Sequence, residues 1–340
     1  MEQRDCKIDI LKGFGILLVI FAHIYQGELN RVIYLFHMPL FVLATGCILP
    51  GQKHLSILKL SKRILVPYLV FSLLSFSYWS VFESHYRIIS SSNDFFCLFT
   101  DSPKLLQFCN IFVAKAFDNS FAYNVVLWYL PCLFVARLIY DSFQGRCEGL
   151  EILCIVICIL VQLFVTPYYS LPFELELSCI FVILFYIGRT VYPYLNKYCY
   201  KNWVMLSLFV VSLFSFYILN SNTHTVIGFV AHIFPSFYLF YAFAILGFFI
   251  IYALSFFTAK VEMLKHKMIW VGKNSLILMC IHEPIKRIVI KLFEFFTNQS
   301  QYVLRYDLIY SFEIFAFLLL LLVPITIVVN KKLPWMVGKN

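Results

Sequence analysis

The segment KGFGILLVIFAHIYQG, residues 12–27, is apolar enough to cross a lipid bilayer, yet it carries a lysine at one end and a histidine near the other. Ionisable side chains inside a membrane are costly, and they usually face a cavity, a partner or one another. Lys12 and His23 are eleven positions apart, which corresponds to roughly 16 Å of helical rise and about three turns. We therefore predict that the two side chains project from one face of a single helix, at different depths.

The apolar character of this segment extends along the whole chain. Of its 340 residues, 61% are hydrophobic and 13% are charged, and the mean hydropathy is +0.83, whereas a soluble domain is about half apolar and a quarter charged. The apolar runs are continuous rather than alternating, which argues against a β-barrel. We expect an all-α, polytopic membrane bundle in which residues 1–340 form a single domain. About ten spans are predicted, near residues 10–26, 31–50, 63–82, 123–140, 151–167, 174–191, 203–220, 230–257, 268–292 and 307–329.

The basic residues that give the chain its net charge of +9 lie mainly in the loops between these spans. Lysine and arginine collect in cytoplasmic loops of membrane proteins, and here the basic loops 51–63, 189–201, 260–267 and 331–339 share one side if both termini are cytoplasmic. We therefore expect a multi-pass protein of a bacterial-type cytoplasmic membrane, without a nucleic-acid partner. Two segments fit less well. Loop 141–150 should be cytoplasmic but is not basic, and the outer segment 286–306 contains Lys286, Arg287, Lys291 and Arg305.

A second histidine begins to define a site. The second span starts RVIYLFHMPLFVLATG, residues 31–46, and Asn30 lies midway between His23 and His37. If the chain turns near Asn30, the hairpin brings both imidazoles to a similar depth, and a kink at Pro39 would open space between the two spans. Each histidine alone could simply hydrogen-bond a neighbouring helix, and Lys12 alone could reach the headgroups. The three together favour a functional site.

Further polar and aromatic groups are weaker candidates. Trp128 and Tyr129 suit a sugar ring, although an aromatic belt at the membrane interface would look the same. Glu174 and Glu176 lie at the start of a span, where they could line a site or be solvated loop acids, and the second interpretation is slightly favoured for Glu174. An adjacent His–Glu pair within a span, His282–Glu283 after Asn274 and Ser275, is expected to face a cavity as often as not. Cys97 and Cys109 share one polar loop, and their pairing depends on the compartment.

Several stretches together resemble one family. KIDILKGFGILLVIFAH at 7–23 followed by FHMPLF at 36–41 is similar to the membrane-bound acyltransferase 3 family, and three later stretches fit the same family in order: LWYLPCLF at 127–134, LPFELELSCIFVILFYIGR at 171–189 and GKNSLILMCIHEP at 272–284. Members of this family O-acylate cell-surface sugars, mostly with acetyl groups from acetyl-CoA, and the sugar O-acetylase branch is the most similar. This chain departs from the family in having Lys12 where arginine is frequent, so a point charge replaces a guanidinium fork.

The resemblance implies roles for particular residues. His23 would be the catalytic histidine, acting as a general base or accepting the acetyl group itself, and His37 would orient it or donate to the developing oxyanion. Lys12, Asp9 and Arg189 would bind acetyl-CoA from the cytoplasmic side. The acceptor would be a surface polysaccharide or its lipid-linked precursor, and no metal is expected. The residues assigned to the acceptor side are Trp128, Tyr129, Glu176, Asn274, Ser275, His282 and Glu283.

A membrane transporter is the main alternative, because it could use the same buried polar groups for a permeating solute. Transporters of this kind are often built from repeats with paired broken helices. No such internal symmetry is visible in the sequence, which favours the acyltransferase.

Overall fold

The computed structural model describes residues 5–49, 56–82, 103–115, 121, 123–198, 200–228, 234 and 236–339, and the regular structure in these ranges is helical. The helices of the N-terminal half are α1 (Cys6–Ile24), α2 (Glu28–Tyr34), α3 (His37–Ile48), α4 (Ile57–Phe82), α5 (Pro103–Val113), η3 (Val125–Trp128), α6 (Tyr129–Phe143) and α7 (Glu148–Phe164). Those of the C-terminal half are η4 (Pro172–Glu174), α8 (Leu175–Tyr198), α9 (Asn202–Thr223), α10 (Phe237–Thr258), α11 (Glu262–Lys273), α12 (Ser275–Thr297), α13 (Gln301–Tyr306), α14 (Leu308–Lys332) and η5 (Pro334–Val337).

The predicted all-α membrane fold is confirmed. Seven helical stretches of the described chain are long and apolar enough to cross a membrane: α2 with α3, α4, η3 with α6, η4 with α8, α9, α10 and α14. The other three predicted spans correspond to α1, α7 and α12. These are also helical, but α7 has 17 residues, and α1 and α12 carry several charged side chains.

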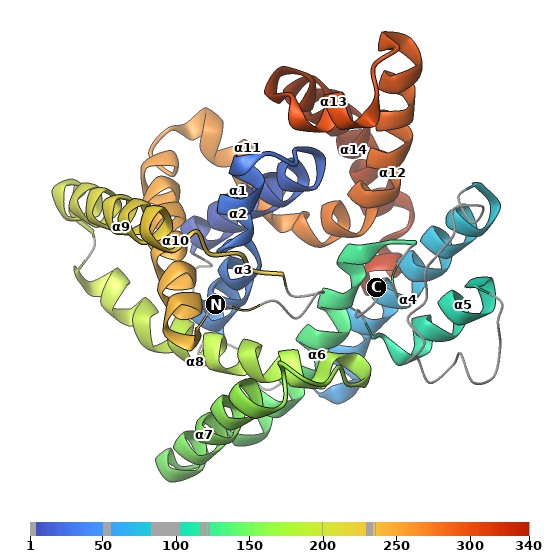
Figure 1. The fold of residues 1–340 in the computed structure, drawn as a ribbon. Helices are drawn as coiled ribbons and strands as arrows, with labels where there is room; N and C mark the ends of the chain where they lie inside the picture. The colour runs from blue at the N-terminus through green and yellow to red at the C-terminus, as the bar shows by residue number, and fades with distance from the viewer. Residues whose placement is uncertain are drawn as a thin grey trace.

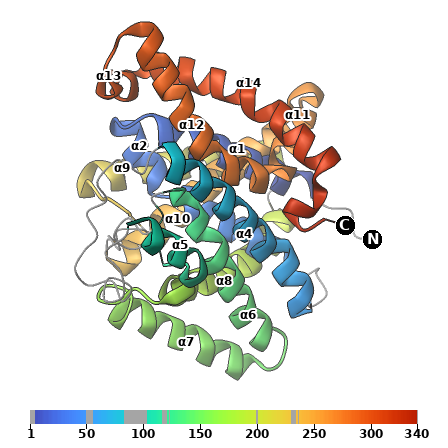
Figure 2. The same cartoon turned by 90° about the vertical axis from the view of Figure 1, so that its right-hand side faces the viewer.

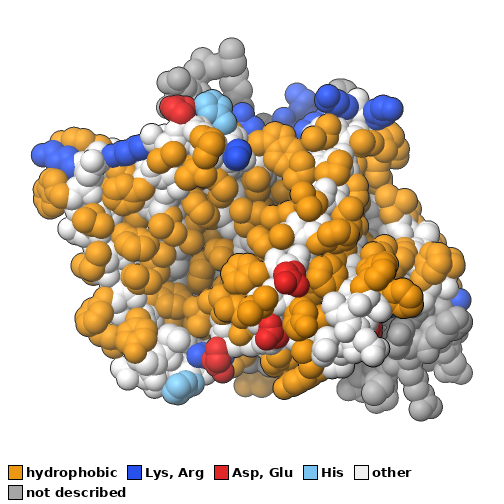
Figure 3. Space-filling model, turned by 90° about the horizontal axis from the view of Figure 1, so that it is seen from above, with side chains coloured by type: hydrophobic (Ala, Val, Ile, Leu, Met, Phe, Trp, Pro, Cys, Tyr) orange, Lys and Arg blue, Asp and Glu red, His pale blue; other side chains and the backbone are white. Residues whose placement is uncertain are grey.

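The outer surface of the bundle is apolar because it is built to face lipid. On α9 and α14 most of the apolar side chains point outward, and Val211 and Leu320 are among the most exposed. Figure 3 shows the resulting belt of hydrophobic side chains, with lysine and arginine gathered along one edge of it. A surface of this kind is stable only in contact with acyl chains.

The basic loops lie at one end of the bundle. Lys7 at the start of α1 donates a hydrogen bond of 3.2 Å to Asn196 at the end of α8. Lys260, just after α10, donates to Asn202 at the start of α9. Segments that the charge bias assigns to one side of the membrane are therefore neighbours in space.

Six helices form a closed ring. α1 packs against α3 and α12, α3 against α8, α8 against α6, α6 against α4, and α4 against α12. α1 lies centrally (Figure 1), since it also contacts α2, α10, α11 and α14. α5 packs on the flank of α4 (Figure 2). Several of the polar residues singled out in the sequence, Lys12, His23 and His37 among them, line a cavity between these helices.

Glycines allow the closest helix contacts in this ring. A Cβ atom placed on Gly188 of α8 would lie 2.4 Å from the carbonyl oxygen of Leu43, and one placed on Gly46 of α3 would lie 2.5 Å from that of Phe185. A similar contact joins α1 to α11, where a Cβ on Gly272 would lie 1.8 Å from the carbonyl oxygen of Asp9. Small residues let helix backbones approach each other, which is how membrane helices gain packing energy without a hydrophobic driving force.

We expect Gly188→Val to destabilise the protein, because the side chain would have to push apart the α3 and α8 backbones. Overpacking of this kind costs about 1–3 kcal/mol. The measurement is the midpoint of thermal unfolding in detergent. Gly149→Val on α7 is the matched control, since nothing lies within 4 Å of a Cβ at Gly149. Equal midpoints for the two variants would contradict the close α3–α8 contact.

The first hairpin differs in detail from its prediction. The chain turns at residues 25–27, between α1 and α2, rather than near Asn30. The break in the second span falls at Leu35 and Phe36, and Pro39 is the third residue of α3. A proline in the first helical turn removes an N–H that has no partner within the helix, so no kink is required there. The possible pairing of Cys97 with Cys109 lies outside the described residues, because Cys97 is not among them.

Candidate active site

An apolar cavity of about 370 Å³ lies inside the helix ring. α1 contributes Lys12, Ile16, Val19 and His23, at positions i, i+4, i+7 and i+11 of one helical face. Lys12 and His23 thus share a face, as their spacing predicts. The rest of the lining comes from α2, α3, η3, α6, the start of α12 and one loop residue: Tyr34, His37, Met38, Phe41, Thr45, Val125, Val126, Trp128, Tyr129, Leu130, Leu133, Gly228, Ser275, Leu276 and Met279.

A second, polar cavity of about 410 Å³ meets the first at His23. Both cavities are lined by His23, Tyr34 and Val125. The remaining lining of the polar cavity is mostly charged or amide-bearing: Ala22, Gln26, Asn30, Glu283, Lys286, Arg287, Ile290, Lys291, Gln301 and Arg305. His23 therefore stands at the junction between an apolar compartment that extends to Lys12 and a polar compartment at the far end of α1.

The backbone fixes the tautomer of His23. Its Nδ1 lies 2.8 Å from the carbonyl oxygen of Val19, one turn earlier. A carbonyl can only accept, so Nδ1 of the neutral ring carries the hydrogen and Nε2 keeps its lone pair. That is the arrangement required of a general base or a nucleophile.

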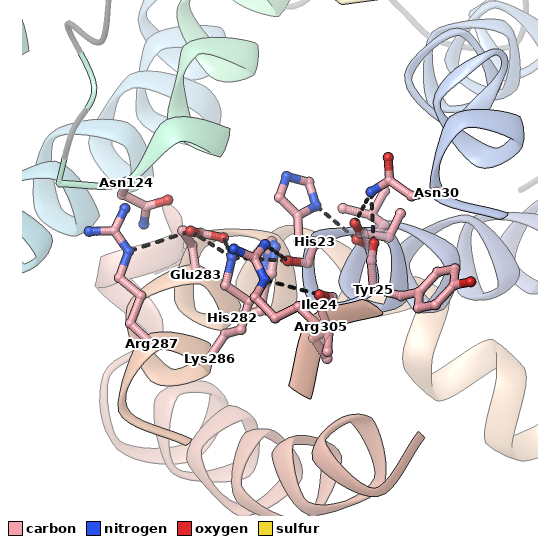
Figure 4. Close-up of polar contacts among 12 residues, drawn as sticks. His23, Ile24, Tyr25, Asn30, Asn124, His282, Glu283, Lys286, Arg287 and Arg305 are labelled. Atoms are coloured by element: carbon pink, nitrogen blue, oxygen red, sulfur yellow. Dashed lines mark hydrogen bonds and ion pairs between the residues drawn. The ribbon is translucent and has the colours of Figure 1, made fainter. Parts of the chain in front are cut away.

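The C-terminal end of α1 is held by side chains from three other helices (Figure 4). The carbonyl oxygen of His23 accepts hydrogen bonds from Lys286 at 3.2 Å and from Arg305 at 3.0 Å. Arg305 also donates to Ile24, and Asn30 donates to the carbonyl oxygens of Ala22 and Tyr25. The last four carbonyls of a helix have no partner within it. Their capping here fixes the position of the His23 side chain.

α12 places a second imidazole beside the first. The ring of His282 lies edge-on to that of His23, with 5.2 Å between centroids. Its Nδ1 lies 3.0 Å from the Leu278 carbonyl oxygen, and its buried Nε2 has no hydrogen-bond partner among the described residues. The ring is fully buried, so this is a buried polar group beside His23 rather than a solvated surface group.

A proline in α12 is compensated locally. Pro284 follows Glu283 and leaves the carbonyl oxygen of Cys280 without its helical donor. The buried side chain of Asn124 fills this vacancy, with its Nδ2 at 2.9 Å from that oxygen. Substitute donors of this type are how prolines are tolerated in membrane helices. Asn124 thereby ties the His282–Glu283 segment to the residues that precede η3.

Glu283 is paired rather than isolated. Its two carboxylate oxygens accept from Lys286 at 2.8 and 2.7 Å, and one of them lies 3.5 Å from Nε of Arg287. Possible ligand atoms of His23, His282 and Glu283 all lie within 4.8 Å of one another, close enough to share a small metal ion. However, two cationic side chains already neutralise the carboxylate and would repel a metal. We therefore interpret these three residues as an acid–base and structural cluster rather than as a metal site.

Tyr34 separates the two histidines of the first hairpin. Its ring lies 5.9 Å from that of His23 and 4.7 Å from that of His37, measured between centroids. Among the hydrogen bonds described, Nδ1 of His37 donates to the Ile33 carbonyl oxygen, at 3.1 Å. Both histidines line the apolar cavity. Tyr34 was not singled out in the sequence, because nothing in the pattern distinguishes it from the other 21 tyrosines.

The structure brings together eight of the predicted site residues and not the other four. Lys12, His23, His37, Trp128, Tyr129 and Ser275 line the apolar cavity, and His282 and Glu283 adjoin His23. The remaining four lie outside the described lining of both cavities. They are Asp9, which is buried against α11; Arg189, which pairs with Glu151 at 3.0 Å; Glu176, which accepts from the Leu171 amide; and Asn274, which is bonded to Asn330.

The chain is thus a multi-pass helical membrane protein with an imidazole between an apolar and a polar cavity. The family model described as an acyltransferase domain matches residues 7–331. The chain therefore belongs to the acyltransferase 3 family and is a membrane acyltransferase. Comparison with curated proteins and with solved structures gave no match.

Proposed function

We propose that this acyltransferase moves an acetyl group from acetyl-CoA to a hydroxyl of a surface polysaccharide or of its lipid-linked precursor. The observation that carries the proposal is the position of His23 where the two cavities meet. A donor entering from the end of Lys12 and an acceptor entering through the polar cavity would meet at one imidazole. Neither substrate would have to cross the bilayer.

The apolar cavity suits the donor arm. Its walls are mostly aliphatic and aromatic, and Lys12 is the basic side chain in its described lining. The anionic head of acetyl-CoA would remain at the basic end of the bundle, where it is attracted by the lysines of the loops. The pantetheine arm would extend along the face of α1 formed by Ile16 and Val19. With both termini cytoplasmic, in a bacterial-type cytoplasmic membrane, this end faces the cytosol.

His23 would perform the acid–base chemistry. Its Nε2 removes the proton from the acceptor hydroxyl, the oxygen forms a bond to the thioester carbonyl carbon, and the carbon–sulfur bond breaks. The proton then passes from His23 to the leaving thiolate, so that an O-acetyl ester and free CoA are the products. The same lone pair would serve the route in which His23 carries the acetyl group between two half-reactions. Trp128 and Tyr129, which were expected on the acceptor side, line the apolar cavity and would instead close the donor side of the junction.

The test is a transfer assay in sealed membrane vesicles of defined orientation. With labelled acetyl-CoA supplied to the face that bears the basic loops, we expect label to accumulate in the glycan; vesicles without the chain should show none. Supplying acetyl-CoA to the opposite face should give little incorporation. Uptake of a solute without any labelled glycan would refute the proposal and favour a transporter. Label in glycan regardless of the face supplied would refute the two-sided path.

A further inference from the structure

Three side chains of the described structure line both cavities: His23, Tyr34 and Val125. A reaction at the junction therefore takes place beside these three side chains, whichever compartment each substrate enters from. Val125 has an apolar side chain, and the lone pair on Nε2 of His23 can accept a hydrogen bond but cannot donate one. Tyr34 is the member of this group that brings a hydrogen-bond donor to the junction.

The ring of Tyr34 is held by packing, while its hydroxyl stays available. Tyr34 is the last residue of α2, and its ring lies between two imidazoles, at 5.9 Å from that of His23 and 4.7 Å from that of His37. The hydroxyl makes no hydrogen bond with any residue that the structure describes. The charges of Glu283 and Arg305 in the polar cavity act on it. The hydroxyl can therefore bind a ligand without breaking a contact within the protein.

The neighbouring imidazoles cannot supply a donor in their neutral form. Nδ1 of His37 and Nδ1 of His282 lie 3.1 and 3.0 Å from the backbone carbonyl oxygen one turn earlier. Each neutral ring therefore carries its hydrogen on Nδ1 and keeps a lone pair on Nε2, as His23 does. The free imidazole nitrogens of this region are thus acceptors, whereas the phenolic O–H of Tyr34 is a donor.

Other side-chain donors near His23 are already used or lie on one side of the junction. Lys286 and Arg305 donate to the carbonyl oxygen of His23, and Asn30 donates to two carbonyl oxygens at the end of α1. Trp128 belongs to the described lining of the apolar cavity but not to that of the polar cavity. Tyr34 is therefore placed to meet a group that is shared by the two substrates.

Acyl transfer creates such a group. When the acceptor oxygen attacks the thioester carbon, Nε2 of His23 takes the hydroxyl proton and the π electrons of the carbonyl move to its oxygen, which becomes an anion. A donor fixed in advance at that oxygen lowers the barrier, and an O–H···O⁻ hydrogen bond is short and strong. The carbonyl double bond then re-forms, the carbon–sulfur bond breaks, and the thiolate takes the proton from His23. The phenol keeps its own proton throughout.

We propose that Tyr34 is a catalytic residue whose hydroxyl donates a hydrogen bond to the thioester oxygen and stabilises the oxyanion formed there. This inference rests on the proposed acetyl transfer and adds to it the group that bears the developing negative charge. His23 and Tyr34 then divide the chemistry, since one accepts the proton of the acceptor and the other donates to the oxygen of the donor. The contact of His37 with the Tyr34 ring keeps that ring in place.

The first test is Tyr34→Phe, which removes the hydroxyl and keeps the ring between the two imidazoles. The purified full chain in detergent receives labelled acetyl-CoA and lipid-linked glycan from the producing cell. We expect kcat to fall by about 10²–10³-fold, the usual effect of losing one oxyanion donor, and both KM values to change by less than about threefold. The midpoint of thermal unfolding should be unchanged, because the hydroxyl has no hydrogen bond to lose among the described residues.

Tyr217→Phe is the matched control for the loss of a phenolic hydroxyl. Tyr217 lies on α9 with 67% of its surface exposed, outside the described lining of both cavities. Its substitution should leave kcat within about twofold, as for surface changes away from a site.

A sulfur analogue of the donor distinguishes an oxyanion contact from a structural role. In acetyl-dithio-CoA a sulfur atom replaces the carbonyl oxygen, and sulfur is a weak hydrogen-bond acceptor. The measurement is the ratio of the rates with acetyl-CoA and with the analogue, each followed by release of the CoA thiol. The ratio should be about tenfold or more larger in the unaltered protein than in Tyr34→Phe, because the variant has no donor at this position to lose.

The outcomes separate this inference from the proposed function. Transfer by Tyr34→Phe at the rate of the unaltered protein would overturn the role of Tyr34 and leave acetyl transfer standing. A raised acceptor KM with unchanged kcat would also overturn it, since the hydroxyl would then bind the acceptor rather than the oxyanion. Equal rate ratios in the two proteins would do the same. Absence of transfer by the unaltered protein would remove the proposed function and the inference with it.

Discussion

Replacing His23 with alanine is expected to lower acetyl transfer by about 10²–10⁴-fold, the usual contribution of a positioned general base or nucleophile. The imidazole is the polar side chain that faces both cavities from α1, and its Nδ1 contact with Val19 leaves Nε2 available. The measurement is kcat with saturating acetyl-CoA and acceptor, in parallel with the yield of monodisperse protein.

His266→Ala is the matched control for this change. His266 also binds the carbonyl oxygen one turn earlier through Nδ1, at 2.8 Å from Glu262, but its ring is exposed on α11. Its removal should leave the rate within about twofold, as for surface substitutions away from a site. Full activity of the His23 variant at normal yield would assign the chemistry to another group. His282 would then be the first to consider, since its Nε2 is buried beside the same junction.

The relation between Lys12 and His23 could be predicted because both residues lie on a single regular helix. Lys12 and His23 lie on one uninterrupted helix, so helical periodicity alone places them on a common face. The membrane fold was predicted from another local property, the continuous apolar runs, because such runs must form helices in lipid. Trp128, Tyr129 and Ser275 also line the apolar cavity, although residue type and the family resemblance, not helical periodicity, pointed to them.

Prediction became weaker where the chain bends. The relation between His23 and His37 depends on the turn at residues 25–27 and on the break at Leu35–Phe36, neither of which has a strong local signal. Tyr34 comes between the two rings as a result. Arg189 illustrates a different difficulty. It was expected at the end of a span, but α8 continues to Tyr198. Its pairing with Glu151 depends on how α7 packs against α8, which no single-helix pattern contains.

The basic residues of the outer segment 286–306 do not follow the charge bias of the loops, and the structure shows where they lie. Lys286, Arg287, Lys291 and Arg305 were visible in the sequence as exceptions to the charge bias, yet their convergence could not be seen because α12 and α13 are separated by a turn. In the structure they explain two features at once. Lys286 and Arg305 hold the end of α1 that carries His23, and all four line the polar cavity. The end of α1 that carries His23 and the lining of the polar cavity thus share one set of residues.

Breaking the buried Glu283–Lys286 pair is expected to cost about 3–5 kcal/mol of stability, because it leaves one charge buried without its partner. The side chains are only 6% and 7% exposed, and the closest atoms are 2.7 Å apart. Glu283→Gln keeps the shape of the side chain but removes the charge that Lys286 needs. The measurement is unfolding in mixed detergent micelles, followed as a function of the denaturing detergent.

The double variant Glu283→Gln/Lys286→Met separates the pair from its consequences. If burial of an unmatched charge causes the loss, removing both charges should recover much of the stability, since replacing a buried ion pair by uncharged groups is often nearly neutral. Activity should recover less, because Lys286 also donates to the carbonyl oxygen of His23 and methionine cannot. Additive losses in the double variant would mean that the two side chains act independently. Full recovery of both stability and rate would show that Lys286 does not help to position His23.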